Sequence, residues 1–428
     1  MRFLVRVLYA IAAKLAGMAS GVIPPSDAKA AIAVRARHGI RRRYTAWAAE
    51  HRDRSRPLLW IHAPSVGEGL MARPVLTLVR SRQPDTQLAY TFFSPSAEEF
   101  SRTLDVDFRD YLPFDSAGDM IAALDALAPK AIVFSKVDVW PELVRQANRR
   151  GVRLGLISAA LAAQSGRRSS VARLLLQDAY AVLDAVGAVD QATAERLVEL
   201  GVRTEVIEVM GDTRFDQVWQ RGAAADRSSG LLARLASERP TLVAGSTWPA
   251  DEAPLLQAIA RVRQRFPALR VILAPHEVTD SHLEPLVRWA TGERCALGRV
   301  DDQSAAAADV VLVDRYGVLG DLYALASFAF VGGGFHDAGL HSVLEPAAFG
   351  APVLFGPRHH KSRDAAMLLA AGAARAVNDA TEIERALVEW LEQPSLRQSA
   401  GEKARATVER GTGAAEKSVK LVERLLSS

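Results

Sequence analysis

Cysteine is nearly absent from this sequence, which has one, Cys295, in 428 residues. A single cysteine excludes an intramolecular disulfide and a zinc site built from cysteines. It is typical of a protein from a reducing compartment such as the cytoplasm. Glycine and proline, at 29 and 20 residues, are too few for a disordered chain. The sequence therefore indicates a folded protein that has no covalent cross-links.

Common signatures of catalytic and cofactor-binding sites are also missing. The chain has no HExxH zinc motif, no Walker A phosphate loop and no GxSxG nucleophile elbow. The segment from Gly332 to Asp337 does not match the GxGxxG fingerprint of dinucleotide-binding domains. Four histidines occur close together in the sequence, at positions 336, 341, 359 and 360. Because imidazoles beside a phosphate site need no metal, we expect neither a metal nor a cofactor.

A long, uninterrupted hydrophobic run is another missing feature. Residues 1–23 are about long enough to cross a bilayer, but Arg6 and Lys14 interrupt them. A charge near the middle of a span costs roughly 2.5–3.5 kcal/mol. On a helix that lies in the interface, Arg2, Arg6 and Lys14 would instead extend toward the headgroups. A spanning helix, an interfacial helix and an ordinary amphipathic helix stay open, and a cleaved signal peptide fits least well.

Arginine is abundant directly after this segment. Residues 35–56 contain eight arginines against two acidic residues, Glu50 and Asp53. Each arginine near an anionic membrane contributes about 1 kcal/mol of binding free energy. We therefore expect an anionic membrane surface to be a partner. Tyr44 and Trp47 are the only nearby aromatics and give no stacking platform, so we expect no nucleic acid.

From Leu58 onward, short apolar segments alternate with helical stretches. Strands are expected near 58–64, 88–93, 131–137, 154–159 and 185–189, and again near 241–246, 271–275, 310–314, 328–332 and 352–356. The segments are nearly all apolar and do not alternate with polar residues, as expected of strands that are buried on both faces of a parallel sheet. The pattern predicts an α/β protein with two Rossmann-like, doubly wound domains that face a cleft. Residues 219–240 would link the domains, and a final helix would cover about 400–426.

Ligands of such folds bind where the strands end, so the residues after each apolar segment are the candidates. Glu68 follows the first strand within Ser65-Val66-Gly67-Glu68-Gly69. It is either a general base or a carboxylate that the helix dipole stabilises. Arg214 could pair with Asp212 or Asp216, or hold a substrate carboxylate.

The second half offers a candidate phosphate site. Ser246 and Thr247 follow a strand and could cap the next helix or bind phosphate. His276 follows another strand. The glycines at 332–334 let a ligand approach the backbone. A short helix is expected to begin near His341, which would place His341 and Glu345 on one helix face.

Taken together, these motifs resemble a known family. HAPSVGEG, GDTRFD, AGSTWPADE, ILAPHE and LEPAAFGAPVLFGP occur in the order found in the Kdo transferases, the 3-deoxy-D-manno-octulosonic acid transferases of lipopolysaccharide synthesis. The resemblance covers about residues 58–395. It implies a GT-B glycosyltransferase that uses CMP-Kdo as donor and a lipid A precursor as acceptor. It also implies a location at the cytoplasmic side of the inner membrane.

The sequence pattern and the resemblance together divide the chain into five parts. These are a membrane-associating segment (1–50), an acceptor domain (51–218), a linker (219–240), a CMP-binding domain (241–395) and a helix that packs back on the first domain (396–428).

The resemblance also gives roles to single residues. Glu68 would deprotonate the acceptor hydroxyl, which attacks the anomeric carbon of Kdo with inversion. Ser246, Thr247 and His276 would contact CMP, and Glu345 would bind the ribose hydroxyls. The other expected contacts with substrate or nucleotide are Ser65, Gly67, Arg214, Gly333, Gly334, His341 and Ser342.

The sequence departs from the family pattern in places. The acidic, tryptophan-containing motif reads Ser135-Lys136-Val137-Asp138-Val139-Trp140-Pro141 and lacks its first glutamate. Ser342 stands where an asparagine is common, and the Asn-Ala-Arg type segment reads Ser158-Ala159-Ala160. Two alternatives therefore stay open: a GT-B enzyme for another nucleotide sugar, and a non-catalytic relative that binds lipid or a partner.

Overall fold

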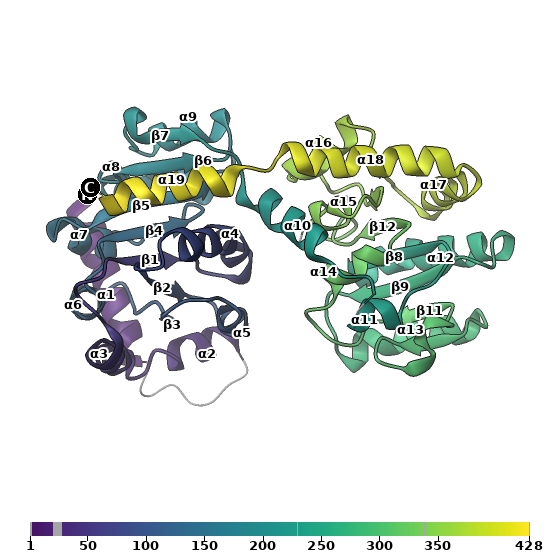
Figure 1. Ribbon diagram of the computed structural model, residues 1–428, viewed down its shortest axis with the longest axis horizontal. Coiled ribbons are helices and arrows are strands. Elements are labelled where there is room, and N and C mark those ends of the chain that lie inside the picture. Colours follow the sequence, from purple (N-terminus) through teal and green to yellow (C-terminus); the bar gives the residue numbers. More distant parts are fainter. Residues whose placement is uncertain (1, 20–27, 229, 338, 428) are drawn as a thin grey trace. The chain divides into compact units, whose positions relative to one another are not determined.

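The computed structural model describes residues 2–19, 28–228, 230–337 and 339–427. The chain divides into two compact units. Unit 1 comprises residues 1–217 and 412–428, and unit 2 comprises residues 218–411. Each unit is a parallel sheet between helices (Figure 1).

The sheet of unit 1 has seven parallel strands in the order β3-β2-β1-β4-β5-β6-β7. Its strands are β1 (Leu58–His62), β2 (Gln87–Phe92), β3 (Phe108–Tyr111), β4 (Ala131–Ser135), β5 (Arg153–Ala159), β6 (Ala185–Ala188) and β7 (Ile207–Val209). Every residue of β1, β2 and β4 is buried. The chain order reverses between β1 and β4, and ligands of doubly wound folds bind at the carboxyl ends of the strands at this point.

Helices connect the strands of unit 1. They are α1 (Arg2–Ala19), α2 (Lys29–Arg35), α3 (Ile40–His51), α4 (Val66–Arg82), α5 (Ala97–Arg102), α6 (Ala117–Leu127), α7 (Pro141–Arg149), α8 (Ser170–Ala181), α9 (Gln191–Glu199) and α19 (Ala414–Ser427). Short 3-10 turns occur at η1 (Gly166–Arg168) and η2 (Thr204–Val206).

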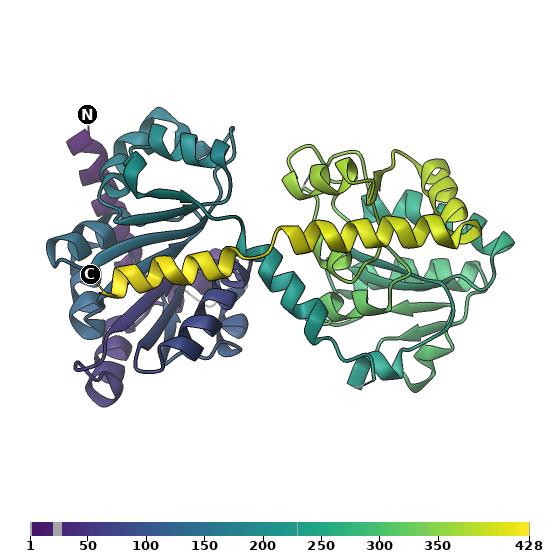
Figure 2. The same cartoon turned by 45° about the horizontal axis from the view of Figure 1, so that its top comes forward.

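The last of these helices returns to unit 1 after unit 2 is complete. α19 packs against α4, β4, β5 and β6, along the sheet (Figures 1 and 2). Gly155 of β5 makes room for it, since a Cβ there would collide with Leu425. At the start of α19, the Asp216 carboxylate accepts hydrogen bonds from the Gly413 N–H (2.8 Å) and the Ala415 N–H (3.1 Å). The expected single helix over 400–426 is therefore wrong, because Gly411-Thr412-Gly413 separates two helices, with φ of +97° at Gly413.

Unit 2 has its own seven-stranded parallel sheet, in the order β10-β11-β9-β8-β12-β13-β14. Its strands are β8 (Thr241–Thr247), β9 (Arg270–Pro275), β10 (Leu297–Arg299), β11 (Val310–Leu312), β12 (Phe328–Val331), β13 (Val353–Phe355) and β14 (Ala374–Ala376). Neighbouring residues of β8 enter different apolar clusters, Leu242 on one face and Val243 on the other. The sheet is thus buried on both faces, as its continuous apolar strands predict. Its chain order reverses between β8 and β12.

The helices of unit 2 alternate with these strands. They are α11 (Gly230–Arg234), α12 (Pro249–Arg265), α13 (Asp280–Gly292), α14 (Leu319–Leu322), α15 (Leu344–Ala348), α16 (Arg363–Ala370), α17 (Ala380–Glu392) and α18 (Pro394–Arg410), with 3-10 turns η3 (Gln303–Ala306) and η4 (Tyr323–Leu325). Within the region 219–240, α10 (Thr213–Ala224) continues from unit 1 and α11 follows.

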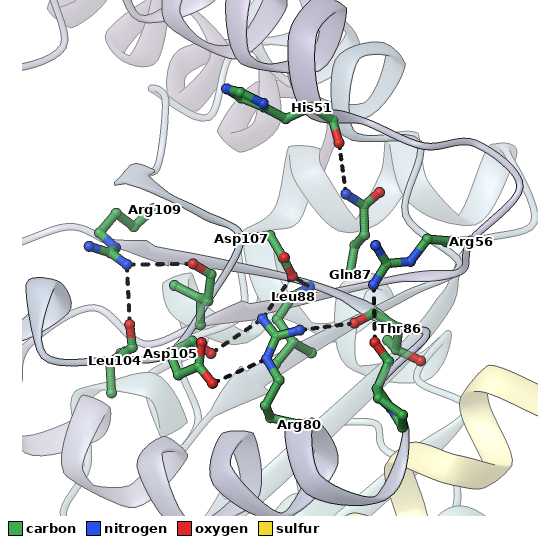
Figure 3. Close-up of polar contacts among 12 residues, drawn as sticks. His51, Arg56, Arg80, Thr86, Gln87, Leu88, Leu104, Asp105, Asp107 and Arg109 are labelled. Carbon is green, nitrogen blue, oxygen red and sulfur yellow. Dashed lines mark hydrogen bonds and ion pairs between the residues drawn. The ribbon is translucent and has the colours of Figure 1, made fainter.

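Polar contacts hold the amino-terminal ends of β2 and β3, away from the carboxyl ends where ligands bind. Gln87 Nε2 donates to the carbonyl of His51 in α3 (2.8 Å), and Arg80 of α4 donates to Asp107 (2.8 Å) (Figure 3). The Leu88 N–H also donates to the Asp107 carboxylate (2.7 Å). These contacts join α3, α4 and two strands, so we assign them to stability.

Helix α1 contacts α2 and α8. The Tyr9 hydroxyl donates a hydrogen bond to the Asp115 carboxylate (2.8 Å). No helix in the described part of the chain is long and apolar enough to cross a membrane. The side chains of Arg2 and Arg6 lie outside the described residues, as do residues 20–23 of the hydrophobic stretch.

Candidate active site

The switch point of unit 1 brings together two segments that are far apart in sequence. Ser65 and Glu68 follow β1, and Ser135 and Lys136 lie at the end of β4. Because β1 and β4 are neighbours in a parallel sheet, their carboxyl ends meet at one edge. The Ser135 hydroxyl donates to the backbone carbonyl of Glu68 (2.9 Å), which ties the two segments together.

Glu68 is held by two side chains. The Ser65 hydroxyl donates to Oε2 of Glu68, and the Lys136 ammonium donates to Oε1 (3.1 Å). The side chain of Glu68 is 15% exposed and that of Lys136 40% exposed. A carboxylate in this position is oriented, and part of it remains accessible to a substrate.

The environment of Glu68 favours its charged form. Burial raises the pKa of Glu68, but hydrogen bonds from Ser65 and Lys136, together with the lysine charge, outweigh this effect. The pKa of Glu68 therefore lies below its ordinary value. At neutral pH the side chain is a carboxylate that can accept a proton.

Ser65 and Gly67 flank this carboxylate. Ser65 is the N-cap of α4, yet its side chain makes no capping hydrogen bond and binds Glu68 instead. Gly67 is exposed, and a Cβ at this position would meet only the Ser65 hydroxyl, 3.8 Å away. Packing within the chain therefore does not require glycine at position 67.

The tryptophan of the altered motif has a structural partner. Trp140 Nε1 donates to Nε2 of the buried His62 (3.0 Å), and the ring of Trp140 stacks on Phe93. Because Nε2 accepts this bond, the proton of His62 must be on Nδ1, which lies 3.0 Å from the hydroxyl of Thr91. Burial, with a contribution from Arg37, lowers the pKa of His62 to about 3, so this histidine is neutral.

Arg214 pairs with Asp212, one of the partners expected from the sequence. Its Nε and Nη2 donate to Asp212 Oδ2 at 2.9 and 2.7 Å. The other candidate, Asp216, instead caps α19. The Thr213 hydroxyl donates a hydrogen bond to the carbonyl of Met71 (2.7 Å), which connects the start of α10 to α4. The GDTRFD segment thus joins α10 to the rest of unit 1.

The switch point of unit 2 contains a bulge. The register of β8 against β9 shifts between Gly245 and Thr247, and Ser246 has a φ of +53°. Non-glycine residues in this region are strained and often mark functional sites. Thr247 is buried, and its hydroxyl donates to the Glu252 carboxylate (2.8 Å). Neither residue caps the next helix, because the N-cap of α12 is Trp248.

The glycine segment after β12 is held by a buried carboxylate. Asp251 of α12 accepts hydrogen bonds from the Gly333 N–H (2.7 Å) and the Phe335 N–H (2.9 Å). It also accepts one from the Trp248 N–H (3.0 Å). Gly333 and Gly334 are buried, and a Cβ at either would collide with the backbone of Gly339 or Gly356. Packing of the chain against itself therefore explains these glycines.

Aromatic rings stack beside this segment. Trp248 stacks with His336, with ring centroids 4.7 Å apart, and with His276, with centroids 4.4 Å apart. His276 in turn lies 4.6 Å from His341. Trp248 Nε1 donates to Nε2 of His341 (3.3 Å), so the His341 proton is on Nδ1. Burial and the neighbouring His276 lower the pKa of His341 to about 4, which makes it a neutral hydrogen-bond donor.

The short helix of this region starts later than expected. α15 begins at Leu344, so His341 and the exposed Ser342 precede it and the expected common helix face for His341 and Glu345 is wrong. The His341 N–H donates instead to the carbonyl of Gly332 (3.1 Å), a tertiary contact that holds this residue in a loop. Burial raises the pKa of Glu345, although Arg221 opposes the shift.

Three residues that contribute to these sites were missed as site residues in the sequence. These residues are Asp251, Trp248 and Lys136, of which Lys136 was named only as part of the altered tryptophan-containing motif. For Asp251, its position three residues after Trp248, as in a capping box, was the available signal. The partner of Lys136 is distant in sequence and gave no local signal.

The chain is similar to known proteins of one family. Residues 37–217 match the family model described as 3-Deoxy-D-manno-octulosonic-acid transferase (kdotransferase). A 3-deoxy-D-manno-octulosonic acid transferase of Bordetella pertussis is 29% identical over 376 residues, which cover 85% of this chain and 86% of the relative. One of Chlamydophila psittaci is 28% identical over 348 residues, covering 80% of this chain and 79% of the relative. The chain is thus similar to Kdo transferases over most of its length.

A solved structure supports the fold of the chain. UDP-GlcNAc 2-epimerase from Neisseria meningitidis, solved with UDP-GlcNAc, aligns with a TM-score of 0.63 at 13% identity, over 87% of this chain and all of the epimerase. The predicted α/β class, a GT-B fold with two Rossmann-like, doubly wound domains, is confirmed.

Proposed function

We propose that this protein is a Kdo transferase, which transfers Kdo from CMP-Kdo to a lipid A precursor with inversion at the anomeric carbon. The observation that carries the proposal is the Glu68 carboxylate, which is oriented, ionised and partly accessible at the switch point of unit 1. The 3-deoxy-D-manno-octulosonic acid transferases that match most of this chain support the sugar.

Glu68 acts as the general base. Its carboxylate accepts the proton of the attacking acceptor hydroxyl, and that oxygen forms a bond to the anomeric carbon of Kdo. The bond from this carbon to the phosphate oxygen breaks, and CMP leaves with the electron pair. Inversion follows because attack and departure occur on opposite faces of one carbon. Ser65 orients the base, Gly67 allows the acceptor to approach it, and Arg214 binds an acidic group of the substrate.

Unit 2 holds CMP. Ser246, Ser342 and His341 contact the phosphate, and the neutral His341 donates from Nδ1. Thr247, Gly333 and Gly334 shape the backbone of this site, and His276 contacts the nucleotide beside Trp248. Glu345, in the first turn of α15, accepts hydrogen bonds from the ribose hydroxyls.

The enzyme works at the cytoplasmic side of the inner membrane. The supporting observation is an exposed apolar face on α1, where Leu8, Ile11 and Leu15 are 57%, 50% and 58% exposed. Their spacing places them on one face of the helix. Several of the arginines after α1 serve the fold instead, since Arg37 is buried and donates to the carbonyls of Leu112 and Ala33.

A transfer assay with CMP-Kdo and a lipid A precursor tests the proposal. We expect Glu68→Gln to lower the rate by about 10²–10⁴-fold, the usual contribution of a general base. CMP affinity should not change, because the residues proposed to bind CMP are in unit 2. Normal turnover of Glu68→Gln would show that Glu68 is not the base.

The nucleotide preference separates this proposal from its alternatives. We expect CMP to bind more tightly than UDP or ADP in a calorimetric titration. Preference for UDP or ADP would indicate another nucleotide sugar. Absence of transfer with any donor, in a protein that still binds lipid, would indicate a non-catalytic relative.

A further inference from the structure

Lys136 occupies an unusual backbone conformation at the end of β4. Its φ is +65°, in the left-handed region that residues with a side chain rarely adopt. The Lys136 N–H is fixed by a hydrogen bond to the carbonyl of Ile157 in the next strand (2.9 Å). A strained lysine that its neighbours hold in place is a candidate for a functional role.

The conformation brings the lysine to Glu68. The Lys136 ammonium lies 3.1 Å from Oε1 of Glu68, and Ser65 binds the other carboxylate oxygen. Lys136 is therefore the cation that contacts the proposed base. An exposed ion pair contributes little to stability, and this lysine is 40% exposed, so stability alone does not explain a strained residue here.

Other charged groups around Glu68 are occupied elsewhere. From β2, Tyr90 approaches Glu68, and burial followed by the Glu68 charge raises the pKa of Tyr90. On α5, Glu98 pairs with Arg102, and on α19, Glu416 pairs with Arg82 at the far end of α4. On α4 itself, Arg73 lies over the ring of Phe100. Lys136 is thus the charged group that, together with the hydrogen bond from Ser65, favours the carboxylate form of Glu68.

We propose that Lys136 is a positioning residue of the transfer reaction, which fixes the orientation of the Glu68 carboxylate and keeps it charged at the moment of attack. This inference rests on the proposed function of Glu68 as base. The lysine has a second effect after the step: once Glu68 holds the acceptor proton, the ammonium favours release of that proton to water. Lys136 thereby resets the base for the next turnover.

The first test follows Glu68 directly and needs no substrate. The full chain is labelled with ¹³C at the glutamate carboxyl carbons, and the Glu68 signal is identified by its loss in Glu68→Gln. We expect Lys136→Met to move the titration of this signal to higher pH, because the lysine charge no longer favours the carboxylate. Lys136→Arg should restore the wild-type midpoint.

Two further variants make the result specific. Lys130→Met removes the exposed lysine at the opposite end of β4 and should leave the titration unchanged. Lys136→Gly removes both the side chain and the backbone strain, so it should fold and show the same upward shift as Lys136→Met. An unchanged Glu68 titration in both Lys136→Met and Lys136→Gly would overturn the inference.

The second test is the pH dependence of kcat/KM. The acid limb should move to higher pH in Lys136→Met and return in Lys136→Arg. If Lys136→Met raised KM for the acceptor while the acid limb and the Glu68 titration stayed in place, the lysine would bind substrate rather than position the base. Wild-type protein without transfer activity would refute the proposed function, whereas the carboxylate titration would still decide the coupling.

Discussion

Chain packing leaves the presence of Gly67 unexplained. An added Cβ would be in open space apart from the Ser65 hydroxyl, and the residue lies in the first turn of α4. We expect Gly67→Ala to leave the free energy of unfolding unchanged or to raise it by about 0.4–1 kcal/mol. Transfer should nevertheless fall, with a higher KM for the acceptor, because the methyl group occupies the space beside Glu68.

Gly69→Ala is the matched control for this prediction. A Cβ at Gly69 would collide with Phe100 and the hydroxyl of Tyr90, so this variant should lose stability. Full activity in a stable Gly67→Ala would mean that no substrate approaches the backbone there.

His62 makes unit 1 sensitive to acid. Its pKa is about 3 in the fold and about 6.5 in an unfolded chain. Between these two pH values His62 is protonated in the unfolded chain and neutral in the folded chain. The free energy of unfolding is therefore highest at neutral pH and falls as the pH drops below about 6.5. At pH 5 the loss is about 2 kcal/mol.

Urea unfolding at pH 7 and pH 5 measures this loss. His62→Gln removes the titrating group, so its two midpoints should differ less than those of the wild type. His38→Gln, at an exposed position, is the control and should retain the wild-type difference. An equal difference in His62→Gln would assign the acid sensitivity to other groups.

Among the elements, the connection between α12 and the glycine segment depends on Asp251. Its carboxylate serves three backbone N–H groups, and each buried donor without a partner costs about 1–3 kcal/mol. We expect Asp251→Ala to destabilise unit 2 by several kcal/mol and to weaken CMP binding.

Asp280→Ala provides the comparison, because Asp280 is an exposed acid in the first turn of α13. It should change stability by a few tenths of a kcal/mol, as loss of a dipole interaction does. Equal effects of the two substitutions would mean that Asp251 acts only through the helix dipole.

The elements also show what the sequence can predict. Strands such as β1 and β8 were predicted because each contains a continuous apolar run, LLWI in β1 and LVA in β8. Strands such as β3, with sequence FRDY, and β7, with IEV, were missed because they are short, lie at sheet edges and carry polar residues. The start of α15 was misplaced because a tertiary hydrogen bond fixes His341.

For the site, local sequence predicted Glu68 but not its partner. Lys136 is 68 residues away in the chain, and the sheet order of β1 and β4 brings the two together. The role of Asp251 was hidden for the same reason, since it binds Gly333, 82 residues away. Residue types at strand ends are visible in a sequence, whereas their pairings depend on topology.

At the scale of the whole molecule, α1 is the expected contact with the membrane. We expect Leu8→Asp with Leu15→Asp to weaken binding to anionic vesicles by at least about tenfold, because each leucine contributes roughly 1.5–3 kcal/mol when it leaves water. Val198→Asp, at another exposed apolar position, should bind like the wild type.

Ionic strength separates the two parts of this interaction. Because salt screens charges, added salt should weaken the electrostatic contribution to wild-type vesicle binding and leave the apolar contribution unchanged. Equal binding of the wild type to neutral and anionic vesicles would remove the electrostatic part of the prediction.

The return of α19 to unit 1 has a consequence for biosynthesis. Unit 1 has an interrupted sequence, and residues 414–427 supply apolar side chains, among them Leu421 and Leu425, that cover β5. During translation this face stays uncovered until the ribosome has made all of unit 2 and then α19, at about 5–20 residues per second. The nascent first unit would therefore be a client for a chaperone, whereas unit 2, whose sequence is continuous, can fold as it emerges.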